Sequence, residues 1–98
     1  MTPPAFIVGW PMAQLRLNRD ALEWREVEGE VVALDVQAAE YIAANRSGAT
    51  IWRKLADGAT RDELVAAIVA RFEVDETTAA RDVDRFVATL RERKLLEG

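Results

Sequence analysis

The sequence predicts a small α+β domain in which a three-stranded antiparallel sheet comes first and three helices follow. Two observations support this prediction. Before residue 45 the chain alternates apolar with polar residues or runs through β-branched ones, as half-buried strands do. After residue 45 apolar residues recur at helical spacing behind capping residues, as they do in amphipathic helices.

Three short strands are expected in the first half of the chain. Residues 22–27 alternate in polarity, and Glu28-Gly29 then supplies a turn, because glycine tolerates a positive φ. The β-branched run over residues 31–36 predicts the second strand. Residues 41–44 are expected to form the third strand, although their alanines would also suit a helix.

Capping residues mark the first two helices. Asn45 or Ser47 can begin the first helix, because a short polar side chain accepts a hydrogen bond from an unpaired backbone N–H group. Gly58 is expected to end this helix as a left-handed C-cap. Thr60 and Glu63 have the spacing of a capping box, which predicts the start of the second helix.

A third and longest helix is expected after Asp75, which can cap it. Its apolar residues form one stripe, made of Ala79, Ala80, Val83, Phe86, Val87 and Leu90. The last two helices, joined by residues 73–75, have the shape of a helix-turn-helix. The predicted architecture is therefore winged-helix-like, with the sheet placed before the helices.

A chain of 98 residues is expected to form one domain. Residues 1–14 hold all three prolines and are predicted to be an extended or disordered N-terminal arm, and residues 15–98 form the folded domain. The chain has no basic signal-peptide start and no apolar stretch of about 20 residues. We therefore expect a cytoplasmic protein with no membrane partner.

The composition argues against an enzyme. The chain has no cysteine and no histidine, which removes thiol catalysis, Ser-His-Asp catalysis and the usual zinc ligands. Asp82 and Asp84 are about 200° apart around a helix, so they make a poor metal site. A net charge of −4 disfavours a nucleic-acid partner. We expect no catalytic residue, no metal and no cofactor, and a binding role has to be considered first.

Several features in a fixed order resemble the PqqD-like recognition elements of peptide-modifying pathways. They are Asn45, the small residues Ser47-Gly48-Ala49, the pair Ile51-Trp52, the segment Asp57-Gly58-Ala59-Thr60, the run Arg71-Phe72-Glu73-Val74-Asp75 and the final pair Leu95-Leu96. The likeness covers residues 15–97. The acidic hairpin and the lack of a fused neighbour look most like the stand-alone leader-binding proteins of lasso-peptide pathways.

The resemblance implies that the leader segment of a ribosomally made precursor peptide binds as an extra strand beside the third strand. It also implies that the partners are a separate cysteine protease and a cyclase of the same pathway, and that tyrosine and proline anchor the leader. The peptide-binding residues implied here are Tyr41, Ile42, Ala43 and Ala44 of the third strand and Asp82, Val83, Arg85, Phe86, Thr89 and Leu90 of the third helix.

Each of these assignments has a plainer alternative. The apolar spacing of Val83, Phe86, Val87 and Leu90 favours the core over the groove for any one of them, and Asp82 and Arg85 are by default solvated charges. Two other functions are also open. One is a winged-helix DNA-binding regulator, for which the third helix offers arginines that acidic neighbours offset. The other is a PqqD-like peptide carrier for a radical enzyme.

Overall fold

The computed structural model describes residues 14–97. The elements in this range are, in chain order, β1 (Gln14–Leu15), β2 (Leu22–Val27), β3 (Glu30–Asp35), β4 (Glu40–Ala44), α2 (Arg46–Asp57), β5 (Ala59–Thr60), α3 (Arg61–Phe72) and α4 (Glu76–Glu92). The arm predicted over residues 1–14 lies outside the described residues, except for Gln14, which belongs to β1.

The predicted three-stranded sheet is confirmed, and each strand lies within one residue of its expected bounds. The strand order is β2-β3-β4, and both pairings are antiparallel. The β2–β3 hairpin turns at Glu28 and Gly29, whose φ angles of 53° and 84° give the twist that two-residue hairpins favour. In the β3–β4 turn, the buried Asp35 carboxylate accepts a hydrogen bond from the Ala38 N–H at 3.1 Å.

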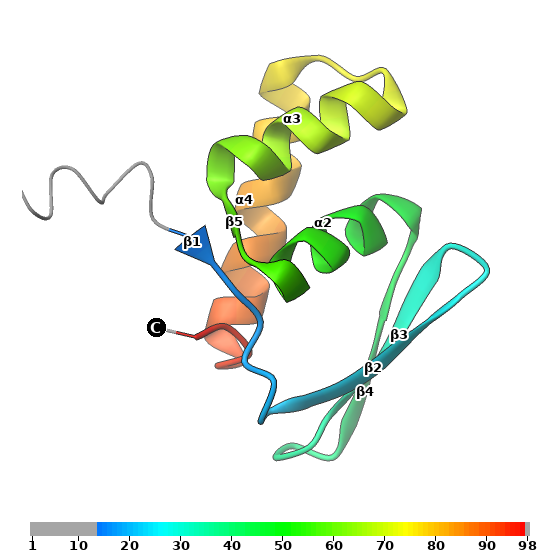
Figure 1. Ribbon diagram of the computed structural model, residues 1–98, viewed down its shortest axis with the longest axis vertical. Coiled ribbons are helices and arrows are strands. Elements are labelled where there is room, and N and C mark those ends of the chain that lie inside the picture. Colours follow the sequence, from blue (N-terminus) through cyan, green and yellow to red (C-terminus); the bar gives the residue numbers. More distant parts are fainter. Residues whose placement is uncertain (1–13, 98) are drawn as a thin grey trace, which may run out of the picture.

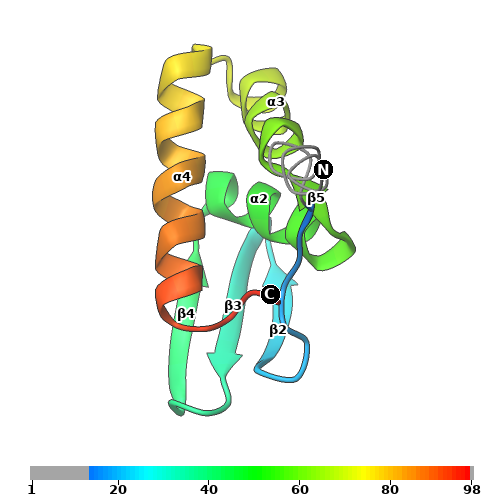
Figure 2. The same ribbon diagram turned by 90° about the vertical axis from the view of Figure 1, so that its left-hand side faces the viewer.

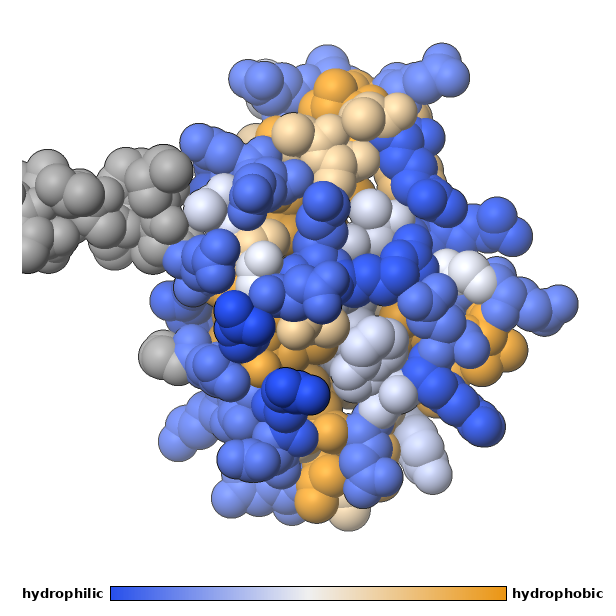
Figure 3. All heavy atoms as spheres, viewed as in Figure 1, coloured by the Kyte–Doolittle hydropathy of each residue, from blue (hydrophilic) through white to orange (hydrophobic). Residues whose placement is uncertain are grey.

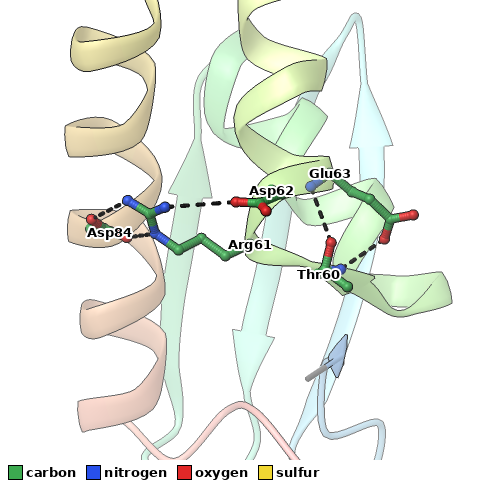
Figure 4. A network of polar contacts seen from close by, with 5 residues as sticks. All are labelled: Thr60, Arg61, Asp62, Glu63 and Asp84. Carbon is green, nitrogen blue, oxygen red and sulfur yellow. Dashed lines mark hydrogen bonds and ion pairs between the residues drawn. The ribbon is translucent and has the colours of Figure 1, made fainter. Parts of the chain in front are cut away.

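Polar side chains begin the first two described helices at the expected places. Asn45 caps α2, because its Oδ1 accepts a hydrogen bond from the Gly48 N–H at 3.0 Å, and the Ser47 hydroxyl donates to the same oxygen. Thr60 and Glu63 form the predicted capping box of α3, as Figure 4 shows. The caps thus settle the sequence-based choice between Asn45 and Ser47.

α4 is held at its start and at its middle. Asp75 caps the helix by accepting a hydrogen bond from the Thr78 N–H at 2.7 Å, and this bond lowers the pKa of Asp75. The Arg61 guanidinium of α3 donates to both carboxylate oxygens of Asp84, at 2.6 and 2.9 Å (Figure 4). The hydrogen bonds from Arg61 lower the pKa of Asp84 below its ordinary value.

The end of α2 differs from the prediction. Gly58 has a positive φ of 94°, but its ψ of 128° is not that of a left-handed helical C-cap. This conformation directs the chain into β5, which pairs antiparallel with β1 through Gln14↔Thr60 and Leu15↔Ala59. The sequence did not predict this two-stranded sheet, because two residues are too few to show an alternating pattern.

The first and last described segments pair with each other. Leu17 and Leu96 form a β-bridge, and a backbone hydrogen bond of 2.8 Å flanks the bridge on either side. We call residues 16–18 and 95–97 the terminal seam. Figure 2 shows the chain returning from the end of α4 to the segment before β2. The seam therefore ties the C-terminal end of α4 to the rest of the domain.

α2 packs against one face of the sheet, α3 packs on α2 and α4, and the core lies between these elements (Figure 1). The largest side chains that are fully buried are Trp52, Leu17, Leu55, Leu64, Leu95, Val31 and Val83. Trp52 of α2 makes edge-to-face contacts with Trp24 of β2, at 6.0 Å between ring centroids, and with Phe86 of α4, at 6.4 Å. This row of three aromatic rings connects the sheet to α4. The α+β fold predicted from the sequence is confirmed.

Most of the surface on the face shown in Figure 3 is hydrophilic, and hydrophobic atoms are visible only in patches. No helix within residues 14–97 is long and apolar enough to cross a membrane. The large hydrophobic side chain with the greatest exposure among these residues is Tyr41 of β4, at 77%. The most exposed large hydrophobic side chain therefore lies on β4, which is an edge strand of the sheet.

Candidate functional site

β4 is an open edge of the three-stranded sheet. It pairs with β3 on one side, and no strand within residues 14–97 pairs with its other side. An unpaired strand presents a row of backbone N–H and C=O groups, and such a row can pair with an extended segment of another molecule.

The register identifies which backbone groups face outward at this edge. In an antiparallel pair hydrogen-bonded residues alternate with non-bonded ones, and the two residues that flank a two-residue turn are bonded. Glu30 of β3 flanks the hairpin turn, so its backbone groups bond to β2. The bonding direction alternates along β3, so the backbone groups of Ala33, three positions later, bond to Ile42 of β4. The neighbours of Ile42 therefore point their backbone groups away from the sheet. These neighbours are Tyr41 and Ala43.

A cleft of about 420 Å³ lies between β4 and α4. Figure 2 shows these two elements side by side. The cleft is lined by Tyr41, Ile42 and Ala43 of β4, by Arg85, Phe86, Thr89 and Leu90 of α4, and by Arg93 at the end of α4. The open backbone edge and the cleft are thus formed by the same strand.

Small residues make room for the aromatic wall of the cleft. A Cβ atom added at Gly48 would lie 3.1 Å from Phe86 Cε1 and 3.1 Å from the Ala44 Cβ, which is closer than such atoms normally approach. On its inner side the Phe86 ring packs against the buried Trp52. The position of this wall therefore depends on the glycine that the sequence places after the α2 cap.

One ion pair joins the two walls of the cleft. Arg93 Nη1 lies 3.3 Å from Glu40 Oε1, and the two side chains are 43% and 62% exposed. An exposed pair of this kind contributes at most about 1 kcal/mol. Within α4, the Thr89 hydroxyl donates a hydrogen bond to the Arg85 carbonyl at 3.1 Å, so its hydrogen is already used by the helix.

Seven of the ten residues predicted for peptide binding line this cleft. Ala44 and Val83 instead lie in the core, at 5% and 0% exposure. Leu90 borders the cleft but is itself a core residue at 2% exposure, so the core interpretation describes Val83 and applies to most of the Leu90 side chain. Asp82 is exposed, one helical turn before the cleft residue Arg85. The assignment of all ten residues to peptide binding stays a prediction.

Two residues of the site were missed by the sequence reasoning. Glu40 lies one position before the predicted third strand, and Arg93 follows the last residue of α4, so neither was among the predicted site residues. A signal for Arg93 was present, because it lies four positions after Thr89 and therefore shares its helix face. No sequence signal joins Glu40 to Arg93, which lie 53 positions apart.

The shifted carboxylate pKa values belong to Asp75 and Asp84, which cap and brace α4 outside the cleft. Among residues 14–97, no group of three or more His, Cys, Asp or Glu side chains is placed to hold a metal ion. The cleft offers outward backbone groups, apolar contact and a few charges.

A small α+β domain of winged-helix order, with an open strand beside a helix, is the class of protein that the fold and cleft define. Comparison with known families identifies it further. The chain belongs to the PqqD family, because the profile of the family described as Coenzyme PQQ synthesis protein D (PqqD) matches residues 30–96. The resemblance inferred from the sequence is thereby confirmed.

Two solved structures are similar to this chain. One, described as "TbiB1 in Complex with the TbiA(beta) Leader Peptide", is 35% identical with a TM-score of 0.77, and the match covers 85% of this chain and 95% of that chain. The other, described as "Lasso peptide synthetase B1 complexed with the leader peptide", is 27% identical with a TM-score of 0.75, and the match covers 88% of this chain and 100% of that chain. No curated protein matches the chain.

Proposed function

We propose that this protein binds the leader segment of a ribosomally made precursor peptide as an additional strand on β4. The observation that carries the proposal is the open edge at Tyr41 and Ala43, which lies beside a cleft lined by apolar residues of α4. Two similar structures, both described as leader-peptide complexes, support it. The site residues are those predicted from the sequence that line the cleft, together with Glu40 and Arg93.

Strand addition divides the recognition into two parts. The outward N–H and C=O groups of Tyr41 and Ala43 pair with the leader backbone, and this pairing supplies affinity for any extended segment. The leader side chains alternate in direction, so every second one faces α4 and meets Phe86 and Leu90. Selection among peptides therefore rests on the cleft, and affinity rests largely on the backbone.

We further propose that the protein acts by binding and presents the leader to separate maturation enzymes, a cysteine protease and a lasso cyclase, in the cytoplasm. The absence of cysteine and histidine from the sequence supports a role without catalysis of its own. A chain without cysteine also suits a reducing compartment. Adding the two purified enzymes to a precursor, with and without this chain, tests presentation, since processing should accelerate when the chain is present.

Isothermal titration tests leader binding directly. The ligand is the leader segment of a precursor identified by sequencing the genes around the one for this chain, and the core segment of the same precursor is the control. We expect the leader to bind with a Kd of about 1 μM or below, and the core segment to show no heat of binding. A folded chain that shows no heat of binding with the leader would refute the proposal. If the same protein instead slowed the migration of a DNA fragment in a gel mobility-shift assay, the winged-helix regulator would be favoured.

A further inference from the structure

The charges around the cleft differ from those of the chain as a whole. The cleft is lined by two cations, Arg85 and Arg93, and it has one carboxylate at its margin, Glu40. The whole chain carries a net charge of −4. The negative charge of the whole protein repels a peptide that is acidic throughout. The positive charge at the cleft attracts a peptide that places a single carboxylate there, so the position of the negative charge on the peptide decides binding.

The two arginines are not equivalent. Arg93 is paired with Glu40 at 3.3 Å. Arg85 forms no ion pair with any carboxylate among residues 14–97, although Asp82 lies three positions before it on the same helix. Arg85 therefore lines the cleft without an ion-pair partner among the described residues. A guanidinium in this state is suited to a carboxylate, which it can bind through two parallel hydrogen bonds.

The spacing of these groups matches that of an added strand. Arg85 and Arg93 are eight positions apart, which is about 12 Å along a helix. Side chains of a strand that face the same way repeat at about 6.6 Å, so three of them span about 13 Å. An extended segment lying along the cleft would therefore bring one such side chain to Arg85, the next to Phe86 and Leu90, and the third to the Arg93–Glu40 pair.

We propose that Arg85 is a specificity residue that binds a carboxylate of the bound peptide, two positions away from the apolar side chain that contacts Phe86 and Leu90. The preferred ligand is thus an extended segment with the pattern acidic–any–apolar, read in either direction. This inference rests on the proposed strand addition at β4. It adds the chemical class of one ligand side chain and the residue that recognises it.

A displayed library of random peptides about twelve residues long tests the inference, since peptides of this length exceed the cleft at about 3.3 Å per residue. The wild-type chain, Arg85→Glu and Arg91→Glu are used as separate baits. Arg91 is the matched control, because it is exposed on the same helix outside the cleft and its substitution changes the net charge equally. The melting temperature of each variant shows that it is folded.

We expect peptides with the acidic–any–apolar pattern from the wild-type chain and from Arg91→Glu. From Arg85→Glu we expect the acidic position to become lysine or arginine. For one selected peptide, Arg85→Glu should weaken binding about tenfold, and changing the peptide carboxylate to lysine should restore most of this loss.

The possible failures are distinguishable. Selected peptides that share an apolar anchor but no acidic position, or that keep the acidic position with Arg85→Glu, overturn the role of Arg85 and leave strand addition standing. A library from which the folded wild-type chain selects nothing overturns strand addition, and the inference falls with it. Binding that survives Ala43→Pro also places the peptide elsewhere on the protein.

Discussion

The two edges of the three-stranded sheet have opposite chemistry. β2 carries Glu23, Arg25 and Glu26 among its six residues, and Glu26 is also tied to Arg53 of α2 by an ion pair of 2.8 Å. β4 has a single charged residue, Glu40, followed by Tyr41, Ile42, Ala43 and Ala44. Charged side chains are a common protection of strand edges against pairing. The difference indicates that one edge is protected and the other is available for a partner strand.

The edges also differ in what lies beside them. β4 borders the cleft that α4 completes, whereas β2 is linked to α2 through Trp24 and Trp52 and through the Glu26–Arg53 pair. A partner strand at β4 finds side-chain contacts as well as backbone groups. β2 also borders a cleft, of about 640 Å³, which is lined by several charged residues including Arg16, Arg19 and Asp57. The two edges therefore differ in the charge of the strand and in the apolar wall that Phe86 provides beside β4.

The largest effect is expected from proline at the open edge. Ala43→Pro removes an outward-facing N–H group and adds a ring where the partner backbone would lie, while the ladder to β3 keeps its bonds through Ile42. Leader affinity should fall by more than about tenfold, with a small change in melting temperature. Titration calorimetry and thermal unfolding measure the two quantities.

The matched control for this variant is Glu26→Pro, because the same register argument makes Glu26 an outward-facing residue of β2. It should lose its ion pair with Arg53 and leave leader affinity unchanged. If both variants weaken binding equally, or if only Glu26→Pro does, the two edges have been assigned the wrong roles.

A smaller effect is expected from Gly48→Ala. Alanine is favoured over glycine in a helix by about 1 kcal/mol, which offsets the tight contacts of the new methyl group. Phe86 is held by Trp52 on its inner side, so it has to shift toward the cleft. We expect stability to change little and leader affinity to fall about fivefold. Unchanged affinity would mean that the leader does not reach Phe86.

Asp84→Asn removes the ion pair between Arg61 of α3 and Asp84 of α4, which lies outside the cleft. The folded-state pKa of Asp84 is lowered by hydrogen bonds from Arg61, so its contribution to stability is present above the unfolded-state pKa and is lost as the pH falls through the folded-state value. Since the side chain is 56% exposed, we expect a loss of only about 0.5 kcal/mol at neutral pH. Denaturant unfolding should show this difference disappearing as the pH falls through the lowered pKa of Asp84. At neutral pH the variant should bind the leader as tightly as the wild-type chain does.

The smallest effect is expected from Glu40→Gln, which breaks the exposed ion pair between the two walls of the cleft. Leader affinity should change by less than about twofold, because exposed pairs contribute little. The change should shrink further at high salt, which screens the charges. A loss comparable to that of Ala43→Pro would instead show that the pair sets the width of the cleft.

Much of the fold could be predicted because its signals are local. Capping side chains such as Asn45, Thr60 and Asp75 contact backbone groups within three positions, so the sequence alone locates the helix starts. The strands follow from alternating polarity. The β1–β5 pair and the terminal seam escaped prediction, because they join segments that are distant in sequence and too short to carry a pattern.

The site could be predicted only in part, for a related reason. Val83 and Phe86 belong to one apolar stripe, three positions apart, yet the first lies in the core and the second lines the cleft. The hydrophobic pattern locates the stripe but does not separate its core residues from its cleft residues. That separation depends on the positions of β4 and Gly48 in the folded structure. That Arg85 has no ion-pair partner among the described residues likewise becomes visible only when its neighbours are placed.

The terminal seam has a kinetic consequence for the way a peptide enters. Residues 16–18 and 95–97 hold the C-terminal end of α4, so this end cannot move outward without breaking the two backbone hydrogen bonds that form the Leu17–Leu96 bridge. We therefore expect the peptide to bind without a prior outward movement of α4. Stopped-flow mixing should show one exponential whose rate grows in proportion to peptide concentration, with no plateau from a slow opening step.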